Sequence, residues 1–184
     1  MQHSLILTHA ALLVGSAAAA ANNTLALNAT RPLDGVCSVV GPDLPSECQC
    51  QQGQNAQFQI SCQVDFLDVD EIGLYALFAP CNQPAAATFE VTEQDAGIDY
   101  KKQYEGGEAM EFPVPGLTVG IPVVGSAQVE LAVDLSGNAE QLSVQLGLDA
   151  CASVFGYQKC GSDLTSELPY YVLSEQYDFS NYCE

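Results

Sequence analysis

The chain has 184 residues and is strongly acidic, with 23 Asp and Glu side chains against four Lys and Arg and a formal net charge of −19. This charge repels nucleic-acid phosphates and anionic lipids and so excludes a nucleic-acid partner, whereas cationic partners and calcium remain compatible with it. Both histidines, His3 and His9, precede residue 10, so the rest of the chain lacks the imidazole that Ser-His-Asp catalysis, Cys-His catalysis and histidine metal sites need.

Residues 1–21 have the pattern of a secretory signal peptide. An apolar run from Leu5 to Val14 is followed by alanines, and Ala19-Ala20-Ala21 fits a small-x-small cleavage site. The segment contains no Lys or Arg, which is atypical, and an uncleaved anchor is the alternative. We predict cleavage before Asn22, an extracellular, secreted product and no membrane span in the mature chain.

Residues 22–36 form an N-terminal extension that carries two N-x-Thr sequons, at Asn22 and Asn28. Asn22 lies next to the predicted cleavage point, so Asn28 is the predicted glycosylation site. Residues 37–184 then form one domain, because 163 residues (184 minus 21) suffice for one core and are too few for two β domains.

Eight cysteines follow the predicted signal, and an even number in an exported chain predicts four disulfides. They are Cys37, Cys48, Cys50, Cys62, Cys81, Cys151, Cys160 and Cys183. The spacing leaves the full pairing open. Two features are expected: Cys151 pairs with Cys160 across a short loop, and Cys183 ties down the carboxyl terminus.

Alternating apolar and polar residues predict the first strands. From Phe58 to Phe66 every second residue is apolar, which indicates a half-buried strand. Similar patterns predict strands over Ile72–Phe78 and Ala87–Val91. Between the first two, the acidic segment Asp65–Glu71 is a candidate for calcium binding, but it does not match an EF-hand loop, and a polar strand end followed by a turn is the favoured interpretation.

Two hairpins are predicted further along the chain. Residues Ile98–Val114 flank a Gly-Gly pair, Gly106-Gly107, which readily takes the positive φ angles of a tight turn. A second hairpin joins the alternating segments 127–135 and 141–148 through a turn at 136–138. Helices are expected to be few and short, with one near Ala150–Tyr157. The pattern as a whole predicts an all-β protein, a single antiparallel sandwich or barrel-like domain stapled by disulfides.

Two segments are candidates for binding. The Pro- and Gly-rich run 113–125 contains Leu117, Val119, Ile121 and Val123, which are predicted either to line an apolar ligand or partner surface or to form an edge strand with its apolar face in the core. The tyrosines of the carboxyl-terminal segment are candidates to anchor an interface, or are packing residues at a sheet rim, and the absence of Trp argues against stacking on sugars. No residue set indicates a cofactor or a metal centre.

Three function classes are compatible with these features. We place first a secreted, noncatalytic binding or matrix protein, whose partner is an extracellular protein, a glycan or an apolar small molecule. The second is a carrier of a small apolar ligand such as a lipid. Export, bridged strands and a cysteine near the terminus resemble secreted β-sandwich lipid carriers of the ML type, although no motif matches. The third is a glycoside hydrolase, which needs two carboxyl groups about 5 to 10 Å apart. We predict that the chain is not an enzyme.

Overall fold

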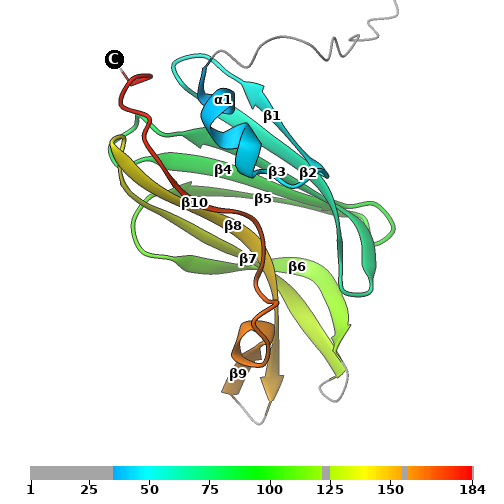
Figure 1. Ribbon diagram of the computed structural model, residues 1–184. Coiled ribbons are helices and arrows are strands. Elements are labelled where there is room, and N and C mark those ends of the chain that lie inside the picture. The colour runs from blue at the N-terminus through cyan, green and yellow to red at the C-terminus, as the bar shows by residue number, and fades with distance from the viewer. Residues whose placement is uncertain (1–34, 122–124, 155–156, 184) are drawn as a thin grey trace, which may run out of the picture. The chain divides into compact units, whose positions relative to one another are not determined.

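The computed structural model describes residues 35–121, 125–154 and 157–183 (Figure 1). The chain divides into two units, 1–31 and 32–184, and the described residues all belong to the second. The predicted signal peptide, its cleavage site and the sequon at Asn28 therefore lie outside the described residues.

In the described part of the chain, ten strands form two antiparallel sheets. Sheet A has the order β1-β2-β3-β4-β5 and contains β1 (Cys48–Gln52), β2 (Phe58–Phe66), β3 (Val69–Ala79), β4 (Ala86–Glu93) and β5 (Ile98–Glu105). Sheet B has the order β10-β8-β7-β6 and contains β6 (Met110–Ile121), β7 (Gly125–Asn138), β8 (Gln141–Val154) and β10 (Tyr170–Tyr177), with β9 (Tyr157–Cys160) paired to the end of β8. The described helices are short: α1 (Val36–Val40), η1 (Gly41–Asp43) and η2 (Gly161–Asp163). The predicted all-β antiparallel class is confirmed.

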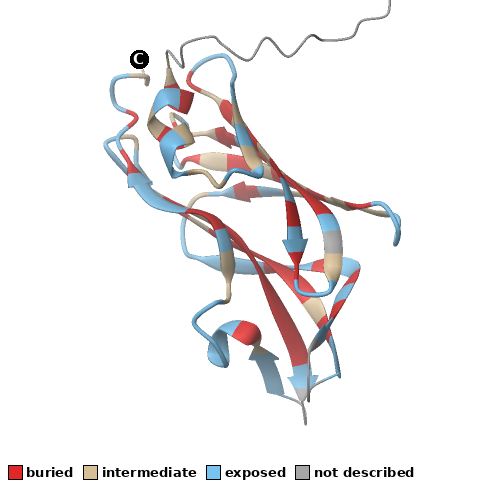
Figure 2. Ribbon diagram, turned by 45° about the vertical axis from the view of Figure 1, so that its right-hand side comes forward, coloured by how far each residue is buried: buried red, intermediate tan, exposed pale blue. Residues whose placement is uncertain are grey.

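One hydrophobic core contains buried residues from both sheets, in a sandwich-like arrangement (Figure 2). The alternation predicted for Phe58–Phe66 is confirmed, because its apolar positions are all buried and its polar positions are not. Several aromatic rings pack against one another in this core. Phe58 stacks on Phe78 with the ring centroids 4.9 Å apart and lies 5.7 Å from the ring of Phe179.

The hairpin predicted over Ile98–Val114 is wrong. β5 is an edge strand of sheet A and β6 an edge strand of sheet B, so the chain crosses between the sheets at Gly106-Gly107. The Gly106 N–H donates to Ala85 O at 2.6 Å, and the Gly107 N–H donates to Leu135 O at 3.0 Å. The two glycines therefore connect sheet A to sheet B, and the reason for a glycine at position 106 is close backbone approach rather than a tight turn.

Gly106→Ala is expected to lower the free energy of unfolding by about 1–3 kcal/mol, the usual penalty for overpacking. A Cβ at this position would lie 2.5 Å from Leu135 O and 2.8 Å from Ala85 O, which are backbone atoms that cannot rotate away. Gly107→Ala is the matched control, since its Cβ would meet nothing within 4 Å. Urea denaturation of both variants tests whether the backbone contacts of Gly106 require a glycine. Equal stabilities of the two variants would contradict this.

The second predicted hairpin is confirmed, with its turn displaced. β7 pairs with β8 out to Asn138 and Gln141, so residues 139–140 form the tip instead of 136–138. The helix expected near Ala150–Tyr157 is wrong for the described residues, because β8 continues to Val154 and β9 starts at Tyr157. In this segment, Cys151 of β8 is bonded to its register partner Cys160 of β9, which holds the two strands together.

All eight cysteines are paired, as predicted. The bridges are Cys37–Cys50, Cys48–Cys62, Cys81–Cys183 and Cys151–Cys160. Both pairing expectations are confirmed, since Cys151 bonds to Cys160 and Cys183 joins the carboxyl-terminal segment to the loop after β3. Four disulfides in a small domain are typical of extracellular proteins. Among the described residues, no helix has the length and apolar character to cross a membrane.

Candidate functional site

The predicted apolar surface is only partly described. Leu117 and Val119 on β6 are each 2% exposed and belong to the core, as the edge-strand alternative predicts. Ile121 ends β6, and its side chain is not described, while Val123 lies outside the described residues.

The acidic segment Asp65–Glu71 makes the turn between β2 and β3. Asp65 Oδ1 accepts the backbone N–H of Glu71 at 3.1 Å, within the turn itself. Asp68 accepts the backbone N–H of Gly120 with both carboxylate oxygens, at 2.9 and 3.1 Å. These contacts give the two carboxylates structural partners in the turn and on β6.

Carboxylates from three strands gather instead on the outer face of sheet B. Glu130 on β7 lies directly opposite Asp149 on β8, and Glu111 on β6 occupies the neighbouring row. Side chains directly opposite on antiparallel strands have Cβ atoms about 4.5–5.5 Å apart, and like charges in such a pair destabilise the sheet. The pair is also buried, because Glu130 is 7% exposed and Asp149 is 0% exposed.

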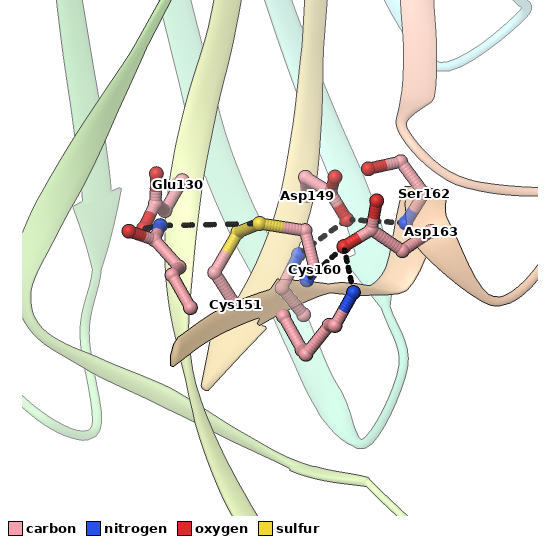
Figure 3. Close-up of a disulfide and its surroundings, with 9 residues drawn as sticks. Glu130, Asp149, Cys151, Cys160, Ser162 and Asp163 are labelled. Carbon is pink, nitrogen blue, oxygen red and sulfur yellow. Dashed lines mark hydrogen bonds and ion pairs between the residues drawn. A yellow bond between two sulfur atoms is a disulfide. The ribbon is translucent and has the colours of Figure 1, made fainter. Parts of the chain in front are cut away.

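The segment from β9 to η2 provides two of the polar partners of this pair, and β8 itself provides the third (Figure 3). The Gln158 side chain donates from Nε2 to Glu130 Oε1 at 2.7 Å. Asp149 Oδ1 accepts the N–H groups of Ala150 at 2.7 Å and Ser162 at 3.3 Å, whereas its Oδ2 is buried without a hydrogen-bond partner among the described residues. Among the described residues, the two buried carboxylates thus share three donors, and none of these is cationic.

The electrostatic field on this face is negative. Burial raises the pKa of Glu130, and the carboxylates of Glu111 and Asp149 raise it further, against the hydrogen bond from Gln158. Burial also raises the pKa of Glu111, and the charges of Asp149 and Asp163 add to this effect. The nearby cation, Lys159, is exposed and forms an ion pair with Asp163 at 3.9 Å. Perturbed carboxyl groups of this kind concentrate at functional sites.

A pocket of about 240 Å³ opens beside these carboxylates. It is lined by Ala109, Met110, Glu111, Ala132, Val133, Gln145 and Tyr171. One row of the sheet explains its shape: Glu111, Ala132, Gly147 and Tyr171 are successive register partners on β6, β7, β8 and β10. The two central residues of the row, Ala132 and Gly147, are small, so the floor of the pocket is low at this point. Glu111 lies on one side of them and Tyr171 on the other. The Tyr171 ring lies against Gly147, where a Cβ would be 2.8 Å from Tyr171 Cδ1.

Glu111 also lies close to the disulfide Cys151–Cys160, with one carboxylate oxygen and the two sulfur atoms within 4.8 Å of one another. The two sulfurs are bonded to each other, so they are not the thiolates that bind metal ions. This group therefore offers one anionic ligand, which is too few for a structural metal centre.

No protein-family model matches the chain, and neither the curated proteins nor the solved structures contain a significant match to it. The function of the chain is therefore inferred from the geometry and chemistry of the site itself.

Proposed function

We propose that the chain is a secreted, noncatalytic extracellular binding protein whose pocket on sheet B accepts an arginine side chain of a partner protein. The observation that carries this proposal is that Glu111 and Tyr171 lie on opposite sides of the floor of a pocket that is lined by no basic residue among those the structure describes. The four disulfides support the extracellular setting.

The chemistry of the pocket favours a guanidinium group. The carboxylate of Glu111 can accept two parallel N–H bonds from the planar group, and the ring of Tyr171 can stack on it. Gln145 adds an amide oxygen at the pocket wall. At about 240 Å³ the pocket is smaller than the roughly 300–1,000 Å³ that holds drug-sized ligands, so a single side chain fits it better than a larger molecule.

The alternatives have less support. A glycoside hydrolase needs a carboxyl pair that touches its substrate, and the pair that faces across two strands here, Glu130 with Asp149, is buried and does not line the pocket. A lipid carrier needs space between its sheets, and the side chains there include the stacked Phe58 and Phe78 and the fully buried Phe89 and Phe179. Both observations favour binding at the surface.

Isothermal titration calorimetry with N-acetyl-arginine amide tests the proposal. Glu111→Gln is expected to weaken binding about tenfold or more, because a charge-assisted hydrogen bond is worth about 1.5–3 kcal/mol and 1.4 kcal/mol is a factor of ten. The neutral isostere N-acetyl-citrulline amide is expected to bind far more weakly than the arginine probe.

The control variant is Glu140→Gln, which makes the same change of charge at an exposed residue of the β7–β8 turn. It is expected to leave the affinity within about twofold of the wild type, because exposed charges at a distance are screened by salt. If Glu140→Gln weakens binding as much as Glu111→Gln does, the arginine probe is attracted by the net charge alone and the proposal is wrong.

A further inference from the structure

We infer that the chain has a second binding site, on the outer face of sheet A, for a neutral saccharide. A pocket of about 310 Å³ lies at one end of this face. It is lined by Gln57, Leu77, Ala79, Asn82, Ala86, Ala87, Thr88, Gln103, Tyr104 and Glu105. The site shares no residue with the acidic pocket of sheet B, so this inference goes beyond the proposed function and stands apart from it.

The pocket lies along one row of the sheet in which polar residues flank Leu77. The strand pairing aligns Gln51, Gln59, Leu77, Thr88 and Gln103, one from each strand of sheet A. Because side chains alternate between the two faces of a strand, these five residues lie on the face opposite the core. The four polar residues of this row offer an extended ligand hydrogen-bonding groups on either side of Leu77, on strands about 4.7–4.9 Å apart.

Among the described residues, each of the two pockets has one acidic lining residue, Glu105 here and Glu111 on sheet B, and the pockets differ in the charges nearby. In the adjacent row, Glu90 is neutralised by Lys101, with Nζ 3.2 Å from a carboxylate oxygen. On sheet B, by contrast, burial raises the pKa of Glu111, and the carboxylates of Asp149 and Asp163 are close enough to raise it further. The chain as a whole has a net charge of −19. A neutral ligand that binds here would remove water from few unpaired charged groups, so its binding costs little in lost hydration of charges.

The lining residues match the two kinds of surface that a sugar ring presents. The side chains of Gln57, Asn82 and Gln103 each combine an amide donor with an amide acceptor, and Thr88 adds a hydroxyl group, so they can satisfy neighbouring sugar hydroxyls. Leu77 is 42% exposed and provides an apolar floor for the C–H face of a ring. Recognition here is through amides rather than through aromatic stacking, which is consistent with a chain that has no Trp.

Nuclear magnetic resonance titration of the whole mature protein with cellohexaose, laminarihexaose, mannohexaose and chitohexaose tests the inference. We expect at least one of them, at millimolar concentration, to shift the side-chain amide signals of Gln57, Asn82 and Gln103. Gln103→Ala is expected to weaken that binding by about three- to tenfold, the loss of one or two neutral hydrogen bonds. The matched control is Gln176→Ala, an exposed glutamine on β10 of sheet B, which is expected to bind like the wild type.

Two results would overturn the inference. One is the absence of any shift at these amides with all four oligosaccharides. The other is binding that Gln103→Ala leaves unchanged. The shifts of the three side-chain amide signals are measured on the unaltered protein, so this part of the test remains valid even if a variant folds poorly. Glu111→Gln is expected to leave saccharide binding intact, which separates this test from that of the acidic pocket.

Discussion

Replacing both Cys81 and Cys183 by serine is expected to lower the free energy of unfolding by about 4–5 kcal/mol. The two residues are 102 positions apart, and a disulfide that closes a loop of about 100 residues restricts the unfolded chain by roughly 4.7 kcal/mol in the chain-entropy treatment. This bridge also holds the segment after β10, where Phe179 is fully buried against Phe58. Loss of the bridge therefore destabilises the fold in two ways: the unfolded chain gains entropy, and the loosened segment exposes apolar surface to water.

Urea denaturation of this double variant, compared with a Cys151→Ser/Cys160→Ser variant, measures the effect. The second bridge spans only 9 residues, for which the same treatment gives about 2–3 kcal/mol. The long-range variant is therefore expected to be the less stable of the two. A long-range variant as stable as the short-range one would show that Cys183 contributes little to holding the terminal segment.

Glu130→Gln is expected to raise the free energy of unfolding at pH 7 by about 1–3 kcal/mol, the range that mutational data give for a buried polar group without adequate partners. The neutral amide fits the same space, its oxygen can still accept from Gln158, and it removes the repulsion between two opposed carboxylates. Glu140→Gln is again the control, because it removes one charge from an exposed position.

The stabilisation expected from Glu130→Gln depends on pH. The pKa of Glu130 in the folded protein is raised above its ordinary value of 4.5, so the folded state holds the proton more tightly than the unfolded state does. The carboxyl group therefore destabilises the wild type progressively as the pH rises from about 4.5 through the folded pKa. Below this window the protonated Glu130 resembles glutamine. Melting curves should show the advantage of Glu130→Gln at pH 7 shrinking toward pH 4, and an advantage that is constant with pH would contradict this account.

The sequence predicts much of the fold because its strands are half-buried. The period-two pattern of β2 identifies both ends of the strand, and its apolar positions are the buried ones. The crossover at Gly106-Gly107 was missed because a Gly-Gly pair permits a tight turn and a close backbone contact alike. The helix near Ala150–Tyr157 was wrong because small residues in β8 weaken the alternation, while the pairing with β9 and the disulfide determine the local structure.

The candidate site could not be predicted because it depends on register. Glu111, Glu130 and Tyr171 are far apart in the chain and meet only when β6, β7, β8 and β10 are aligned. The opposed pair of carboxylates could have been found from the register of the β7–β8 hairpin. If Asn138 pairs with Gln141, then eight residues away from the turn on each strand Glu130 faces Asp149. Placing the turn at 136–138 hides this pair, since a shift of register changes which residues are opposite.

The most direct test of the arginine-binding pocket is a nuclear magnetic resonance titration of the mature protein with methylguanidinium, followed through the backbone amides and the Gln145 side chain. The account predicts saturable shifts centred on Glu111, Ala132, Gln145 and Tyr171, all of which line the pocket, and their loss in Glu111→Gln. Shifts spread over acidic residues throughout the surface, with no saturation and no dependence on Glu111, would contradict it.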